Sequence, residues 1–135
     1  MKVLTIYRGV TSFSIPFINY YLNRRLAHGK EHPERFPERK GQASRMRPAG
    51  PLAWIHAASV GEAQSALTLI QHMLRRRTDL HVLVTTGTIT SAEIMSDRLP
   101  ARSFHQFVPV DRIGWVRRFL DHWDPDFAIW VESEF

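Results

Sequence analysis

The chain has 135 residues, of which 44% are hydrophobic and 23% charged, and its formal net charge is +5. This length corresponds to one domain with a substantial core, and the composition excludes a disordered or fibrous chain. The sequence contains no cysteine, which excludes disulfides, a thiolate nucleophile and cysteine-based metal sites.

Positive charge is concentrated in the first third of the chain. Residues 1–48 contain ten lysines and arginines against three glutamates, whereas the rest contains eight arginines against ten acidic residues. Arginine supplies most of the cations, and its planar guanidinium suits phosphate better than a lysine does. A basic leading segment indicates an anionic partner, which is phospholipid, nucleic acid or a phosphorylated substrate.

The first 27 residues have an amphipathic pattern but form no clean membrane span. A spanning helix needs about 20 mostly apolar residues, whereas polar side chains and Pro16 interrupt the best candidate, residues 10–26. Its aromatic and aliphatic residues recur at roughly helical spacing and are followed by Arg24 and Arg25, a pattern typical of an interfacial helix. We predict an amphipathic membrane-associating helix over residues 1–27; the alternative is a helix packed on protein.

Residues 28–50 have the composition of a loop. They are rich in proline, glycine, lysine and arginine and poor in aliphatic residues. We predict an extended, basic connector that lies on the surface and leads into a domain over residues 51–135.

From residue 52 onward, short apolar runs alternate with amphipathic helical patterns. The predicted strands are 52–58, 81–86, 104–108 and 127–131, and the predicted helices are 62–77, 90–99 and 111–123. Apolar strands that alternate with helices indicate βαβ units on a parallel sheet with helices on both faces, a Rossmann-like α/β fold. The last helix is expected to turn Ile113, Val116, Phe119 and Leu120 inward, at 3-4 spacing.

Ligands of open α/β sheets bind beyond the carboxyl ends of the strands, and the first such end carries Ser59-Val60-Gly61-Glu62. One interpretation is a capping box, in which Ser59 and Glu62 bond each other's backbone N–H groups at a helix start. The other makes Glu62 a general base beside a ligand cleft, with Gly61 allowing close approach to the backbone.

Polar residues also follow the second and fourth strands. Thr86, Gly87 and Thr88 precede a helix and could form an anion site, although the alternative is a capping box from Thr90 to Glu93. The segment is neither a Walker A loop nor a Gly-x-Gly-x-x-Gly fingerprint. Glu132 follows an apolar strand, either in a solvated cleft or simply solvated at the sheet edge.

Together these residues resemble the Kdo transferase family. His56-Ala57-Ala58-Ser59-Val60-Gly61-Glu62 is similar to its His-x-x-Ser-Val-Gly-Glu signature. Four further matches follow the family order: Lys30-Glu31 with Arg35-x-x-Glu38-Arg39-x-Gly41, Thr85-Thr86-Gly87-Thr88, Pro109-Val110-Asp111 and Glu132-Ser133-Glu134-Phe135. Ser133 and Phe135 replace the more usual Thr and Leu, and the leading segment is a poorer anchor than expected.

The resemblance implies a fold and an activity. Kdo transferases attach 3-deoxy-D-manno-octulosonic acid (Kdo) to the lipid A precursor in lipopolysaccharide core biosynthesis and are similar to other two-domain GT-B glycosyltransferases. Residues 51–135 would form the acceptor-binding domain, truncated before the domain that binds the donor CMP-Kdo, so the fragment alone is expected to be inactive. The resemblance implies neither a metal ion nor a cofactor.

The resemblance also implies residue roles and a location. Glu62 matches the proton acceptor of an inverting reaction, and Glu132 matches a transition-state stabiliser. Five further residues are expected to bind substrate: Ser59, Gly61, Arg39, Thr86 and Thr88. The expected partners are a phosphorylated glycolipid and a membrane surface, at the cytoplasmic face of the inner membrane of a Gram-negative bacterium.

Two other functions remain open from the sequence. One is another GT-B glycosyltransferase of envelope synthesis with a different acceptor. The other is a non-catalytic Rossmann-like module that binds anionic lipid through the basic segment. Nucleic acid is disfavoured because that segment lacks interleaved aromatic residues beyond Phe36 and the rest of the chain is slightly acidic.

Overall fold

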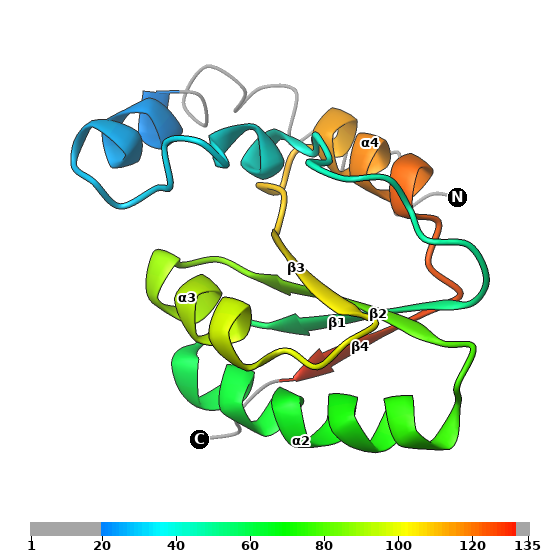
Figure 1. Cartoon of the computed structure of the whole chain (residues 1–135). Coiled ribbons are helices and arrows are strands. Elements are labelled where there is room, and N and C mark those ends of the chain that lie inside the picture. Colours follow the sequence, from blue (N-terminus) through cyan, green and yellow to red (C-terminus); the bar gives the residue numbers. More distant parts are fainter. Residues whose placement is uncertain (1–19, 132–135) are drawn as a thin grey trace.

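The computed structural model describes residues 20–131 and contains one parallel four-stranded sheet (Figure 1). The strands are β1 (Leu52–Ala57), β2 (His81–Thr86), β3 (Ser103–Phe107) and β4 (Phe127–Val131), in the order β3-β2-β1-β4. All three pairings are parallel. The predicted Rossmann-like α/β fold is confirmed, and each predicted strand lies within one residue of the observed one.

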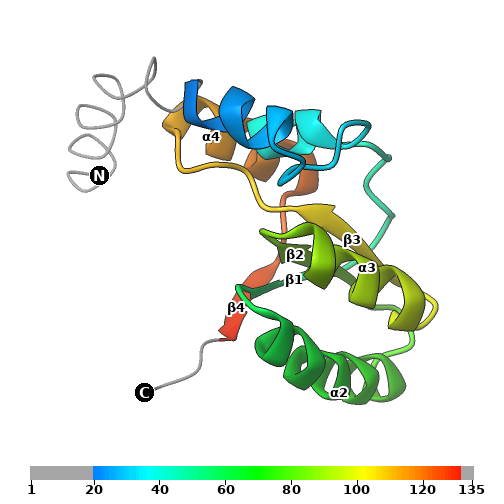
Figure 2. The same ribbon diagram turned by 90° about the vertical axis from the view of Figure 1, so that its left-hand side faces the viewer.

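Helices cover both faces of the sheet, as predicted. They are α2 (Val60–Arg76), α3 (Ile89–Arg98) and α4 (Ile113–Trp123). The first two lie on one face and α4 lies on the other (Figures 1 and 2). The chain therefore winds from β1 to β3 along one face, then crosses to the other face to place β4 beside β1.

Two apolar layers sandwich the sheet, because successive side chains of a strand point to opposite faces. Ala53, Ile55 and Ala57 of β1 belong to the cluster under α2 and α3. Leu52 and Trp54 belong to the cluster under α4. This alternation accounts for the unbroken apolar runs that identified the strands in the sequence.

The buried face of α4 differs from the predicted one. Trp115, Phe119 and Trp123 are buried, whereas the side chain of Leu120 is 40% exposed. The i, i+4, i+8 stripe of aromatic rings turns inward because these rings bury the most apolar area. The indole N–H of Trp123 also gains a hydrogen bond to Oε1 of Gln106, at 3.0 Å.

Residues 20–50 are here called the leader segment, and within it the predicted connector, residues 28–50, is not simply an extended surface loop. Residues 20–27 are helical, and a 3-10 helix, η1 (Phe36–Lys40), follows. Glu31 and Glu38 are each only 1% exposed. The predicted interfacial helix lies mostly outside the described residues.

The leader segment is ordered because it completes the open edge of β3. Oε1 of Glu38 accepts a hydrogen bond from the backbone N–H of Phe107, at 2.8 Å. The guanidinium of Arg35 donates to the carbonyl of His105, at 3.0 Å. These side chains satisfy outward-facing groups of an edge strand that would otherwise lack partners.

Candidate active site

The order in which strands are added to the sheet reverses at β1, between β2 on one side and β4 on the other. The first crossover from β1 leads to β2 on one side, whereas β4 pairs with the other side of β1. Such a switch point is where open α/β sheets hold ligands. The residues that follow β1 therefore line the position at which the fold favours binding.

The turn after β1 holds the carboxylate of Glu62 against backbone N–H groups. Its Oε2 accepts from Ala58 at 3.1 Å and from Ser59 at 3.0 Å, and the N–H of Glu62 donates to Oγ of Ser59 at 3.3 Å. This capping box starts α2, as predicted. The carboxylate lies at the positive end of the helix dipole, and the two N–H donors fix its orientation.

The surroundings of this turn are open. Ser59 and Gly61 are exposed, and a Cβ at Gly61 would meet no atom within 4 Å. A ligand can therefore approach the backbone here, as the predicted role of Gly61 requires. Glu132, the predicted stabiliser, directly follows Val131, which pairs with Ala57. Glu132 itself lies outside the described residues.

The turn after β2 is connected to the leader segment. Thr86 is fully buried, and its Oγ1 lies 2.7 Å from Nε2 of His105. Nδ1 of His105 lies 3.0 Å from the guanidinium of Arg35. Because a guanidinium can only donate, Nδ1 must accept, and the imidazole hydrogen sits on Nε2 and points to Thr86.

The protonation of His105 follows from the same arrangement. Burial, together with the positive charge of Arg35, lowers the pKa of His105 to about 3. The imidazole is therefore neutral at ordinary pH. Since His105 donates to Thr86, the hydroxyl hydrogen of Thr86 is directed to some other acceptor.

Thr88 caps α3, and the predicted box from Thr90 to Glu93 is wrong. The helix begins at Ile89, and Oγ1 of Thr88 accepts from the N–H of Ser91 at 3.2 Å. The hydroxyls of Thr88 and Ser91 also bond each other. A start two residues earlier lets Ser91, which is buried, form this contact with Thr88.

Arg39 lies beside the end of β3. Its Nη1 donates to the carbonyl of Val108 at 2.5 Å, and its Nε is 3.6 Å from Oε2 of Glu31. Burial lowers the pKa of Arg39. Nε of Arg39 is buried without a hydrogen bond in the described part of the chain. A role for Arg39 in substrate binding stays a prediction.

Sequence reasoning missed the network that joins the leader segment to the sheet. Glu38 accepts two hydrogen bonds from Arg35, at 2.8 and 2.9 Å, and one from Ser44 at 2.6 Å. Arg35 continues to His105, and His105 continues to Thr86. The available signal was the presence of Glu31, Glu34 and Glu38 in a segment otherwise rich in arginine and lysine, because carboxylates among arginines can form ion pairs.

Among residues 20–131, no three histidine or acidic side chains are grouped so that they could hold a metal ion. Over the same residues, no helix combines the length and apolar character needed to cross a membrane.

The fold and the site define the class of protein. A parallel α/β unit with helices on both faces and a helix-capping carboxylate at its switch point has a Rossmann-like fold. The chain belongs to the family of 3-deoxy-D-manno-octulosonic-acid transferases (Kdo transferases), whose N-terminal family profile matches residues 34–135. The resemblance seen in the sequence motifs is thereby confirmed.

Similar proteins come from a plant and from bacteria. The chain is 39% identical over 132 residues to a probable mitochondrial 3-deoxy-D-manno-octulosonic acid transferase of Arabidopsis thaliana, covering 98% of this chain and 30% of that protein. It is 49% identical over 83 residues to the 3-deoxy-D-manno-octulosonic acid transferase of Rickettsia felis, covering 62% and 18%. The corresponding Rickettsia bellii protein is 36% identical over 132 residues, covering 98% and 32%.

The chain thus spans at most about a third of the length of these relatives. No solved structure matches it.

Proposed function

We propose that the chain is the acceptor-binding part of an inverting enzyme that transfers Kdo from CMP-Kdo to the lipid A precursor. The observation that carries this proposal is the position of Glu62. Its carboxylate is held by the N–H groups of Ala58 and Ser59 at the open switch point of the sheet. Family membership supports the reaction class, and the geometry supports Glu62 as the base, because it lies where open α/β sheets commonly hold ligands.

The chemistry requires a proton acceptor on the acceptor side. As the sugar hydroxyl attacks the anomeric carbon of Kdo, its proton must leave, and the bond to CMP breaks on the opposite face. A carboxylate within hydrogen-bond reach of that hydroxyl performs this step, and Glu62 is our candidate. We assign Glu132 to stabilise the positive charge that develops at the anomeric carbon, in the manner of paired carboxylates in glycosyl transfer.

The same proposal places the protein at a membrane. The acceptor is a lipid, so the enzyme must work at the surface that holds it, and we propose the cytoplasmic face of the inner membrane. The basic charge of residues 1–48 supports attraction to anionic lipid. Ser59, Gly61, Thr88 and Arg39 remain our candidates for contacts with substrate, whereas Thr86 is fully buried and we propose no direct contact for it.

Two variants of the complete gene product test the role of Glu62. Glu62→Gln keeps the shape and can still bond the N–H of Ser59, because Glu and Gln both serve in capping boxes. It cannot accept a proton. Turnover of CMP-Kdo and lipid A precursor should therefore fall by about 10²–10⁴, while the melting temperature stays nearly unchanged.

Ser59→Ala provides the matched contrast at the same helix start. It removes the hydroxyl that accepts from Glu62 but leaves the carboxylate, so it should lower stability by about 1 kcal/mol and affect turnover less. If Glu62→Gln transfers Kdo at a near-normal rate, Glu62 is only a cap and the assignment fails.

A further inference from the structure

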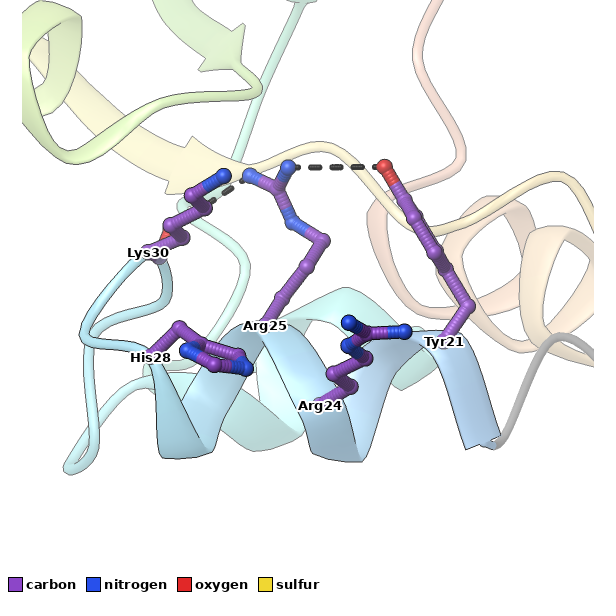
Figure 3. Close-up of a pocket in the computed structure, with 5 residues that line it drawn as sticks. All are labelled: Tyr21, Arg24, Arg25, His28 and Lys30. Carbon is purple, nitrogen blue, oxygen red and sulfur yellow. Dashed lines mark hydrogen bonds between the residues drawn. The ribbon is translucent and has the colours of Figure 1, made fainter.

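A cavity of about 340 Å³ opens on the leader segment, and four of its five lining side chains are basic. It is lined by Tyr21, Arg24, Arg25, His28 and Lys30 (Figure 3). We propose that this cavity binds the phosphomonoester group of a membrane lipid. That the lipid is the glycolipid acceptor rests on the function proposed above, whereas the phosphate site does not.

The local fold gathers these side chains on one face. Tyr21, Arg24, Arg25 and His28 are spaced i, i+3, i+4 and i+7 along residues 20–27 and the turn that follows, so they share one face of the helix. Gly29 then adopts a left-handed conformation with φ +71°. This turn brings the chain back, and Figure 3 shows Lys30 beside the guanidinium of Arg25.

The end of the helix is capped by backbone hydrogen bonds, which reduce the negative charge that free carbonyls would place there. The N–H of Gly29 donates to Leu26 at 3.1 Å, and the N–H of Lys30 donates to Arg25 at 2.9 Å. These two bonds form the Schellman arrangement that closes a helix. A guanidinium nitrogen of Arg25 also donates to the carbonyl of Lys30, at 3.4 Å.

The cavity holds positive charge that the protein does not neutralise. Arg25 pairs with the buried Glu31, its Nε lying 2.8 Å from Oε1. By contrast, the side chains of Arg24 and Lys30 have neither a hydrogen bond nor an ion pair in the described part of the chain, and both are exposed.

Arg25 is fixed in place and still has donors to offer. Glu31 takes its Nε and raises its pKa by that hydrogen bond. Its two outer nitrogens make only long contacts, 3.5 Å to the hydroxyl of Tyr21 and 3.4 Å to the carbonyl of Lys30. A phosphate oxygen could replace these contacts with shorter, charge-assisted hydrogen bonds.

The residues that line the cavity favour a phosphomonoester, and the exposed tyrosines at its opening favour a lipid. A dianionic phosphate matches a fixed guanidinium fork, two further cations and a phenolic hydroxyl. The side chains of Tyr20 and Tyr21 are 67% and 58% exposed, and exposed tyrosines next to cations are typical of a membrane interface. In Figure 1 the helix of residues 20–27, in blue, lies on the side to which the arrows of β1 and β4 point, the side at which α2 begins.

The test uses the whole chain with vesicles that differ in headgroup chemistry. Phosphatidylcholine vesicles carry either phosphatidic acid, a phosphomonoester, or phosphatidylglycerol, a phosphodiester, at matched surface charge. We expect tighter binding to phosphatidic acid. The double variant Arg24→Gln/Lys30→Gln should lose affinity for these vesicles on the order of 30-fold.

The matched control removes two exposed arginines from the far end of α2. Arg75→Gln/Arg76→Gln changes the net charge equally and should lose less than about threefold. Equal binding to the two lipids, or equal losses in the two double variants, would mean general attraction of charge and would overturn the site.

A second arm separates lipid phosphate from free phosphate. Inorganic phosphate is titrated at constant ionic strength while the backbone amide signals of residues 21–30 are followed by NMR. Weak or absent saturation together with binding to phosphatidic acid supports the lipid-borne source. Saturation by inorganic phosphate without vesicle binding overturns it. Neither arm measures Kdo transfer, so failure here is distinct from failure of the role of Glu62.

Discussion

The leader segment and the rest of the described chain, residues 51–131, here called the sheet domain, are stabilised by different forces. In the described chain, the fully or nearly buried hydrophobic side chains lie in residues 51–131, apart from Leu22. Conversely, the two buried charged side chains, Glu31 and Glu38, both belong to the leader segment. The sheet domain is therefore held by apolar packing, and the leader segment by buried ion pairs and hydrogen bonds.

This difference determines how each part responds to change. Apolar packing tolerates conservative exchanges, because it is non-directional and proportional to buried area. A buried carboxylate that loses its partners, or arginines that lose their carboxylate, leave an uncompensated charge. The leader segment should therefore detach as a unit when one central contact is removed, while the sheet domain stays folded.

The largest effect is expected from Glu38→Ala. This carboxylate bonds Arg35, Ser44 and the N–H of Phe107. Its removal should lower the free energy of unfolding by about 3–5 kcal/mol, the usual cost of breaking a buried pair, as measured by urea denaturation. Glu34→Ala, an exposed glutamate of the same segment, is the control and should change stability by less than about 0.5 kcal/mol. Similar results for both variants would contradict the central role of Glu38.

The second largest effect is expected from Gly41→Ala. Gly41 has φ +78°, and a Cβ there would overlap the backbone carbonyl of Trp115 on α4. Left-handed strain and the enforced shift together should cost roughly 2–4 kcal/mol. At Gly29, φ is +71° but no atom lies within 4 Å of the added Cβ, so Gly29→Ala should cost only about 1 kcal/mol. Equal melting temperatures for the two variants would show that the leader segment does not pack tightly on α4.

The same contrast explains which features the sequence could reveal. The strands of the sheet domain were found to within a residue, because each depends on a local apolar run such as His81–Thr86. The Ser59–Glu62 capping box was also found, since its partners are three residues apart. Features of this kind depend on residues that are close together in the sequence, so the local pattern predicts them.

The leader segment escaped prediction because its partners are distant in the sequence. Glu38 bonds Phe107 across 69 residues, and Arg35 bonds His105 across 70. A basic, proline-containing stretch is typical of a loop, and nothing local shows that it covers the edge of a sheet. The buried face of α4 was misjudged for a similar reason, because Gln106 is the partner that draws Trp123 inward.

The buried His105 should make the folded protein less stable at acidic pH. The pKa of His105 falls from an unfolded value of 6.5 to about 3 in the folded protein, so the unfolded chain binds the extra proton first as pH falls. Stability from this group is complete above pH 6.5 and declines as pH falls toward 3. Between pH 6.5 and 5 the loss should be roughly 2 kcal/mol, measured by urea denaturation at each pH.

The variant His105→Gln tests whether His105 causes this loss of stability as the pH falls. A Gln amide can accept from Arg35 and donate to Thr86 but does not titrate. Between pH 6.5 and 5 the variant should lose about 2 kcal/mol less than the wild-type chain. If the variant loses as much stability between pH 6.5 and 5 as the wild-type chain does, groups other than His105 cause the sensitivity to acid.

The smallest effect is expected in the sheet domain, at the start of α3. Thr88→Ala removes the oxygen that accepts from Ser91 and should cost about 1 kcal/mol. Thr90, the residue that the sequence pattern favoured, lies within the first turn and is exposed. Thr90→Ala should therefore change the free energy of unfolding by less than about 0.5 kcal/mol. The melting temperatures of the two variants decide between the two caps, because a larger loss for Thr90→Ala would place the helix start where the sequence pattern put it. A small loss for Thr88→Ala, set beside a large one for Glu38→Ala, would show that polar contacts in the sheet domain are local and individually replaceable, whereas those of the leader segment act together.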